Sequence, residues 1–227
     1  MAEKKYVYSF GGGDSEGSGS MKELLGGKGA NLAEMASLGL PVPPGFTITT
    51  ECCVDYFREG GRLPACLEEQ VKTALARVES VMGMKFGDPV DPLLVSCRSG
   101  ARSSMPGMME TVLNVGLATS TIPGLIARTG NERFVYDAYR RLIMMYSDVV
   151  MEKAEGIEPA EGKAIRKQLD AMMEELKRAK HYASDTDLTV EDLKQLCTAF
   201  KAKVRETLGA EFPDDPVRQL WGGICAV

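Results

Sequence analysis

Residues 93–111 read Leu-Leu-Val-Ser-Cys-Arg-Ser-Gly-Ala-Arg-Ser-Ser-Met-Pro-Gly-Met-Met-Glu-Thr. The three apolar residues at the start of this stretch predict a buried strand. That strand would deliver Arg98 and Arg102 into a segment rich in glycine and serine. Guanidinium groups match phosphate oxygens in pairs of parallel hydrogen bonds. The stretch therefore indicates a phosphate-binding loop that follows a strand.

The small residues of this loop favour the same chemistry. Main-chain N–H groups near Gly100 and Gly107 can approach an anion because no side chain stands in the way. Serine hydroxyls can donate hydrogen bonds, and Pro106 fixes the chain before Gly107. The candidate phosphate-binding residues here are Arg98, Ser99, Gly100, Arg102, Ser103, Ser104, Met105, Pro106 and Gly107. The alternative is an exposed turn whose two arginines pair with surface carboxylates, and composition does not choose between the two.

A second candidate anion site is the sequence Gly-Gly-Lys-Gly at residues 26–29, which precedes a predicted helix over residues 30–38. It is not a P-loop, because Gly29 stands where a P-loop carries Ser or Thr. N–H groups at a helix start beside the Lys28 ammonium nevertheless form a credible anion site. The alternative is a solvated lysine on a tight turn.

The composition of the chain argues against a nucleic-acid-binding protein. The chain has 227 residues and a formal net charge of -5. It has no block rich in lysine and arginine, which argues against a nucleic-acid surface. Its length suits one large or two small globular domains.

Cysteine usage and the apolar runs indicate an intracellular, soluble protein. The six cysteines contain no C-x-x-C pair, and Cys52 adjoins Cys53, which is awkward for a disulfide framework. No apolar run approaches the roughly 20 residues of a membrane span, and the N-terminus lacks the apolar core of a signal peptide. We therefore expect no membrane partner.

The first half of the chain predicts strands that alternate with helices. The predicted strands are residues 5–10, 46–50, 93–98 and 112–117, and the last is the expected antiparallel partner of the one before it. The predicted helices are residues 51–59 and 64–82, in addition to residues 30–38, whose apolar face is Leu32, Met35 and Leu38. The glycine-rich residues 11–20 are predicted to be a linker or mobile flap. We expect one sheet covered on one face.

The second half is predicted to be helical. The helices are residues 122–152, 160–181, 190–208 and 213–227, with Thr189 as an N-cap and Gly209 as a stop. The core face of the first is predicted to be Phe134, Ala138, Leu142, Met145 and Val149. The sequence thus predicts an α+β protein with a sheet-containing, phosphate-binding subdomain at 1–117, a helical subdomain at 118–214, and a helix at 215–227 that returns to the first subdomain.

Several motifs in one order resemble the N-terminal nucleotide-binding domain of the pyruvate, phosphate dikinase family. They are residues 95–111 quoted above, Leu-Leu-Gly-Gly-Lys-Gly-Ala-Asn-Leu-Ala-Glu-Met at 24–35, Val-Pro-Pro-Gly-Phe at 42–46, Arg-Phe-Val-Tyr-Asp-Ala-Tyr-Arg-Arg at 133–141, Met-Tyr-Ser-Asp-Val-Val-Met at 145–151 and Asp-Thr-Asp-Leu-Thr at 185–189. The resemblance implies an ATP-grasp-like sheet portion with an inserted helical subdomain. It also places Lys28 where the family carries a lysine implicated in nucleotide binding.

The resemblance implies a phosphotransferase. In the family's reaction ATP, pyruvate and phosphate give AMP, phosphoenolpyruvate and diphosphate through a phosphohistidine, with Mg²⁺. Arg98 would hold the phosphates, the loop would shield the γ-phosphoryl end and Lys28 would add charge. Two alternatives stay open: a fragment of a phosphoenolpyruvate synthase, and a non-catalytic nucleotide-binding or interaction module.

The resemblance also implies that this chain is an incomplete catalyst. Its only histidine, His181, lies in a polar helix end without the threonine and glycine context of the family's phosphohistidine, so we expect no catalytic residue here. We expect the Mg²⁺ ligands, the phosphohistidine domain and the regions that form the family's homodimer to lie outside this chain. The cytoplasm is the default compartment, although family members also occur in plastids and glycosomes.

Overall fold

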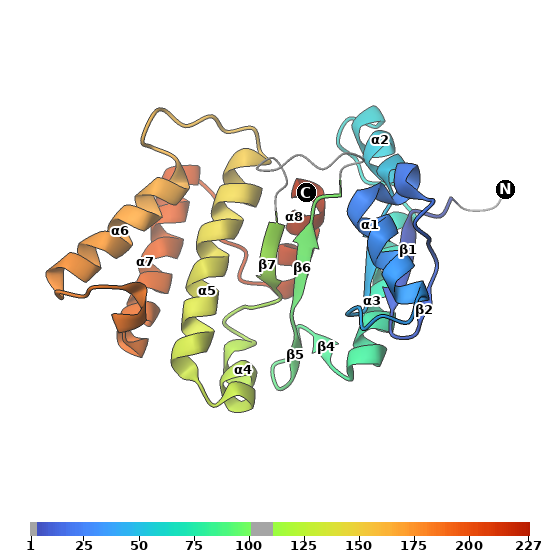
Figure 1. Cartoon of the computed structure of the whole chain (residues 1–227). Helices are drawn as coiled ribbons and strands as arrows, with labels where there is room; N and C mark the ends of the chain where they lie inside the picture. The colour runs from blue at the N-terminus through green and yellow to red at the C-terminus, as the bar shows by residue number, and fades with distance from the viewer. Residues whose placement is uncertain (1–3, 101–110) are drawn as a thin grey trace. The chain divides into compact units, whose positions relative to one another are not determined.

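The computed structural model describes residues 4–100 and 111–227, and it combines helices with small sheets (Figure 1). The chain divides into two compact units. Unit 1 comprises residues 1–84 and 99–109, and unit 2 comprises residues 85–98 and 110–227. The mixed helix and sheet content confirms the predicted α+β class. The predicted subdomain boundaries after residues 117 and 214 stay a prediction.

Unit 1 is a three-stranded antiparallel sheet with three helices. The strand order is β2-β1-β3, with Tyr8 of β1 opposite Thr47 of β3. The elements are β1 (Val7–Gly11), β2 (Asp14–Ser15), β3 (Gly45–Ile48), α1 (Lys22–Ser37), α2 (Thr50–Arg58) and α3 (Leu67–Met82). The predicted strands over residues 5–10 and 46–50 and the predicted helices over residues 51–59 and 64–82 are confirmed within a few residues.

Two predictions about unit 1 were incomplete. Residues 11–20, predicted to be a linker or flap, contain β2. Two carboxylates hold this segment, because Glu16 accepts a hydrogen bond from the Ser9 N–H and Glu34 accepts one from the Gly19 N–H, each at 2.7 Å. Helix α1 begins at Lys22 rather than at residue 30. The predicted helix is therefore only the second part of α1.

The predicted apolar face of α1 was right only at Leu32, which is partly buried and packs against a core cluster that includes Ala36. Met35 and Leu38 are 42% and 70% exposed, and the buried face is formed by alanines that include Ala33. The reason is a close approach of the helix to the sheet, since a Cβ at Gly29 would lie only 2.7 Å from the Thr47 side chain. At such a separation only small side chains fit between helix and strand.

Unit 2 contains two two-stranded sheets and a group of helices. Strand β4 (Lys85–Phe86) pairs in parallel with β5 (Pro92–Leu93), and β6 (Val95–Arg98) pairs antiparallel with β7 (Thr111–Val115). The predicted antiparallel partner is thus confirmed. The prediction of a single sheet was wrong. Pairing of β6 with β7 shifts register between Val95 and Cys97, and Asn114, with a left-handed φ of 58°, lies in the corresponding part of β7.

Helix α5 lies at the centre of unit 2, packed against both α7 and β7 (Figure 1). The helices are α4 (Ile122–Thr129), α5 (Glu132–Tyr146), the π-helix Ser147–Lys153, α6 (Ile165–Ala179), the 3₁₀-helix Asp185–Asp187, α7 (Val190–Leu208) and α8 (Pro216–Ala226). The predicted single helix over residues 122–152 is broken. Gly130, with φ 62°, ends α4, and the Asn131 side chain caps α5.

The predicted core face of α5 was right in part. Leu142 and Val149 are buried, but Phe134 is 57% exposed and Val135 is buried in its place. The residues buried on α5 include Val135, Leu142 and Tyr146, so the buried face of this helix begins one position after Phe134.

The capping signals of α7 are confirmed. The Thr189 side chain accepts a hydrogen bond from the Asp192 N–H, and the Asp192 carboxylate accepts one from the Thr189 N–H. Gly209 ends the helix with φ 70°. Asp192 is fully buried, and it also receives hydrogen bonds from the Lys180 ammonium and the Tyr182 hydroxyl. Burial raises the pKa of this carboxyl, but these hydrogen bonds outweigh burial and lower its pKa from 3.8 to about 2.

This carboxylate gives an acid-stability prediction. Since the pKa of Asp192 is lower in the folded state, the unfolded chain binds the proton more readily between about pH 2 and pH 4. We expect Asp192 to contribute about 1–2 kcal/mol to the free energy of unfolding above pH 4, and this contribution is lost as the pH falls to 2. Urea unfolding followed by circular dichroism will measure this contribution. In Asp192→Asn the free energy of unfolding should depend less on pH between about pH 2 and pH 4. Equal acid slopes in both proteins would contradict the assignment.

None of the helices in residues 4–100 and 111–227 combines the length and the apolar character of a membrane span.

Candidate nucleotide site

Lys28 lies on α1 just after an interruption of that helix. Gly26 has φ 69° and ψ 168°, so the first turn, which begins at Lys22, is separated from the remainder of the helix. Only glycine adopts this conformation readily. The next turn is held on the sheet by the contact of Gly29 with Thr47. The base of the half-buried Lys28 side chain is therefore fixed relative to β3.

The Lys28 ammonium binds the start of the candidate phosphate loop. Its Nζ donates a hydrogen bond to the main-chain carbonyl of Ser99 at 3.1 Å. The next residue, Gly100, also lies beside α1, since a Cβ on it would be 3.8 Å from the Leu25 carbonyl oxygen. Three of the predicted site residues, Lys28, Ser99 and Gly100, thus come together within unit 1. Lys28 and Ser99 are 71 positions apart in the sequence.

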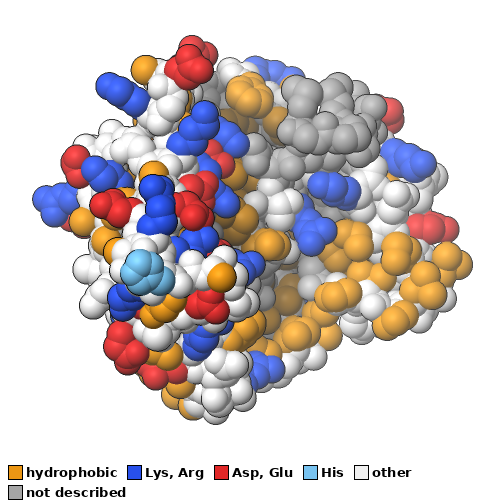
Figure 2. Space-filling view, turned by 60° about the vertical axis from the view of Figure 1, so that its left-hand side comes forward, with side chains coloured by type: hydrophobic (Ala, Val, Ile, Leu, Met, Phe, Trp, Pro, Cys, Tyr) orange, Lys and Arg blue, Asp and Glu red, His pale blue; other side chains and the backbone are white. Residues whose placement is uncertain are grey.

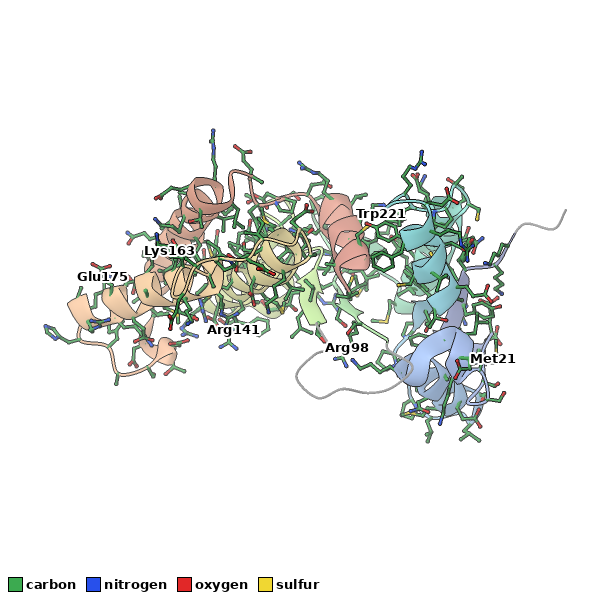
Figure 3. All side chains as sticks on the ribbon, turned by 90° about the horizontal axis from the view of Figure 1, so that it is seen from above. Met21, Arg98, Arg141, Lys163, Glu175 and Trp221 are labelled. Atoms are coloured by element: carbon green, nitrogen blue, oxygen red, sulfur yellow. The ribbon has the colours of Figure 1, made fainter. Side chains whose placement is uncertain are left out.

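Arg98 is the last residue of β6 and belongs to unit 2 (Figure 3). It is exposed, while its neighbour Cys97 is buried, as expected from the alternation of side chains along a strand. Across the ladder it is opposite Thr111 of β7. The expectation that Arg98 and Lys28 bind the same triphosphate stays a prediction.

The other predicted loop residues, Arg102, Ser103, Ser104, Met105, Pro106 and Gly107, lie outside the described residues. Sequence reasoning missed the acceptor of the Lys28 hydrogen bond. That acceptor is a main-chain carbonyl, and its direction depends on the path of the chain rather than on the identity of the residue.

A cavity of about 300 Å³ in unit 1 does not have the chemistry of a phosphate site. Its lining is glycine main chain and apolar side chains: Gly11, Gly12, Gly13, Ala36, Gly39, Leu40, Pro41 and Val42. An anion requires donors and positive charge. We therefore place the candidate site at Lys28 and not in this cavity.

No group of three or more His, Cys, Asp or Glu side chains that could hold a metal ion occurs in the described part of the chain. His181 is exposed just after α6 and adopts a left-handed φ of 56°. The face that carries the histidine also carries basic, acidic and apolar side chains (Figure 2). Its N–H donates to the Arg178 carbonyl, as a residue at a helix end does.

Residues 22–77, which contain Lys28, match the family model described as "Pyruvate phosphate dikinase, AMP/ATP-binding domain". Over 224 residues, 98% of this chain, the sequence is 50% identical to pyruvate, phosphate dikinase of Clostridium symbiosum. The chain is similar over nearly its whole length to the N-terminal part of pyruvate, phosphate dikinases. The resemblance stated above is thereby confirmed. It is also 46% identical over 98% of its length to the dikinase of Rhizobium meliloti, and 49% identical over 99% to a chloroplastic dikinase of Zea mays.

The chain spans about a quarter of the length of these dikinases: 24% of the Clostridium and Rhizobium proteins and 22% of the Zea mays protein. The description of the matching family model names AMP and ATP as ligands of that domain.

Proposed function

We propose that this chain binds the phosphates of ATP through Lys28, Arg98 and the loop that follows Arg98. The observation that carries the proposal is the 3.1 Å hydrogen bond from Lys28 to the main chain of Ser99, which brings the lysine of the AMP/ATP-binding match to the start of the candidate phosphate loop. A flexible ammonium with three donors suits phosphate oxygens. The planar guanidinium group of Arg98 can donate two parallel hydrogen bonds to two phosphate oxygens.

The proposed reaction is that of the dikinases: ATP, pyruvate and phosphate give AMP, phosphoenolpyruvate and diphosphate through a phosphohistidine. Within it, Lys28 and Arg98 would orient the phosphates and neutralise their charge, which is the main contribution that a protein makes to phosphoryl transfer. We include in this proposal that the sheet-containing part of the chain is ATP-grasp-like and carries an inserted helical subdomain. The homodimer and the phosphohistidine domain belong to this proposal as properties of the full-length enzyme.

Magnesium does not enter the steps that we assign to this chain. The described residues do not supply a set of carboxylates suited to it. We propose that Mg²⁺ in the full-length enzyme is held by residues beyond those described here, and that it would screen the phosphate charges when bound.

We predict that removing the Lys28 ammonium weakens ATP binding. Lys28→Met keeps most of the stem and removes the charge, so we expect the Kd for ATP to rise about tenfold, or about 1.4 kcal/mol. Isothermal titration calorimetry will measure the change. The matched control is Lys22→Met, an exposed lysine in the first turn of the same helix, which should leave the Kd unchanged. If the affinity for ATP fell equally in both variants, the loss would come from the change in net charge, and Lys28 would not be part of the binding site.

Arg98→Met tests the second residue of the site in the same way. We expect about a tenfold or greater rise in Kd, because a guanidinium can make two hydrogen bonds to a phosphate group. Binding that is unchanged in this variant would remove Arg98 from the proposed site. Strict dependence of the full-length enzyme on inorganic phosphate would support the dikinase reaction, and water as the acceptor would contradict it.

A further inference from the structure

The hydrogen bond from Lys28 to the Ser99 carbonyl links two parts of unit 1. It joins a helix turn that is fixed on the sheet to a segment that is distant in sequence. The chain passes from unit 2 to unit 1 between Arg98 and Ser99, so the bond holds the first residue on the unit 1 side of that crossing.

The chemistry of the ammonium allows two tasks at once. Lys28 has three N–H donors, and the Ser99 carbonyl uses one of them. Phosphate oxygens can accept from the others without breaking the hydrogen bond to Ser99. A carbonyl held by a cation is also fixed more firmly than one held by a neutral donor, because hydrogen bonds to charged groups are stronger.

We infer that Lys28 is a positioning residue as well as a phosphate ligand: its ammonium fixes the main chain at Ser99 before nucleotide binds, and it keeps that bond while it contacts phosphate. The phosphate part of this inference rests on the proposed function. The main-chain part does not. Fixing Ser99 in advance reduces the conformational entropy that nucleotide binding would otherwise remove from this segment.

The test is amide hydrogen exchange of Ser99 and Gly100, measured by NMR on the 227-residue chain without nucleotide. We expect Lys28→Met to speed exchange at these two amides about three- to tenfold, since loss of the tether permits local opening. Exchange in the body of α1, at Ala33, should not change, which shows that the helix is intact. Lys22→Met is the matched control and should leave all of these rates unchanged. Lys28→Arg, which keeps a cationic donor, should lie closer to the wild type than Lys28→Met.

A second arm adds ATP to the wild-type chain. Slower exchange at Ser99 and Gly100 would support the shared ammonium, whereas faster exchange would show that phosphate displaces the carbonyl and would overturn it. Unchanged exchange in nucleotide-free Lys28→Met would overturn the main-chain part. If ATP produced neither binding heat nor any change in the NMR spectrum, the proposed function would fail, and the phosphate part of this inference would fail with it. Faster exchange in Lys28→Met would still support the main-chain part.

Discussion

Replacing Gln219 with methionine will lower the free energy of unfolding by about 3–5 kcal/mol. The Gln219 side chain is fully buried on α8 and makes three hydrogen bonds to main chain. Its Oε1 accepts from the Gly116 N–H at 3.0 Å, and its Nε2 donates to the carbonyls of Leu117 and Pro213 at 3.1 and 2.9 Å. It thereby joins the segment after β7 to the segment that leads into α8, about 100 residues later.

Methionine fills nearly the same volume but leaves these three main-chain groups without their partner. Each buried polar group that loses its hydrogen bond costs about 1–3 kcal/mol, and the costs are not additive. Equilibrium unfolding in urea will give the difference. Gln168→Met is the matched control, because Gln168 is only partly buried and its hydrogen bonds to the Lys163 carbonyl and from the Thr207 hydroxyl are exposed, so that its replacement should cost less than about 1 kcal/mol. Similar losses in the two variants would show that the buried position of Gln219 is not the cause.

Replacing Gly222 with alanine will also destabilise the protein, by about 2–3 kcal/mol. Helix propensity alone predicts the opposite, because alanine is favoured over glycine inside a helix by about 1 kcal/mol. The contacts around Gly222 in the structure reverse the sign of the expected change in the free energy of unfolding. A Cβ at Gly222 would overlap the Tyr146 hydroxyl oxygen and would lie 3.2 Å from Val150 Cγ1. Tyr146 is buried and packs edge-on against Phe212 at a centroid distance of 5.7 Å, so its ring cannot move without disturbing the core.

A second substitution tests this explanation. Tyr146→Phe removes the hydroxyl oxygen that would collide with the new methyl group. The cost is small, because that hydroxyl donates only a long hydrogen bond of 3.4 Å to the Arg218 carbonyl. We expect the double variant to recover most of the stability lost by Gly222→Ala, as measured by thermal and urea unfolding. Additive losses in the double variant would show that the two residues are independent and would contradict the contact.

The candidate site shows how far sequence reasoning reached. Glycines, serines and two arginines after an apolar run predicted a phosphate loop, and Gly-Gly-Lys-Gly before a helix predicted a second anion site. The structure brings Lys28 to Ser99 and Gly100. Nothing in the sequence by itself said that these two stretches meet, because their contact runs through a main-chain carbonyl. The positions of Arg102 and the residues after it in the site remain predictions.

The sequence by itself determined the features that depend on neighbouring residues. Thr189 and Asp192 fix the start of α7, Gly209 fixes its end, and the β6–β7 pair follows from two apolar runs on either side of a loop. These signals are local, since a cap or a left-handed glycine acts within one helical turn.

Only the tertiary structure decided which side of each helix is buried and which small residues are required. Helix α1 buries alanines and exposes Leu38 because Gly29 brings it close to β3, and α8 needs Gly222 because Tyr146 occupies the adjacent space. Residues distant in sequence determine both separations. Close packing of the interior makes such separations exact to within a methyl group, and no pattern along one segment contains that information.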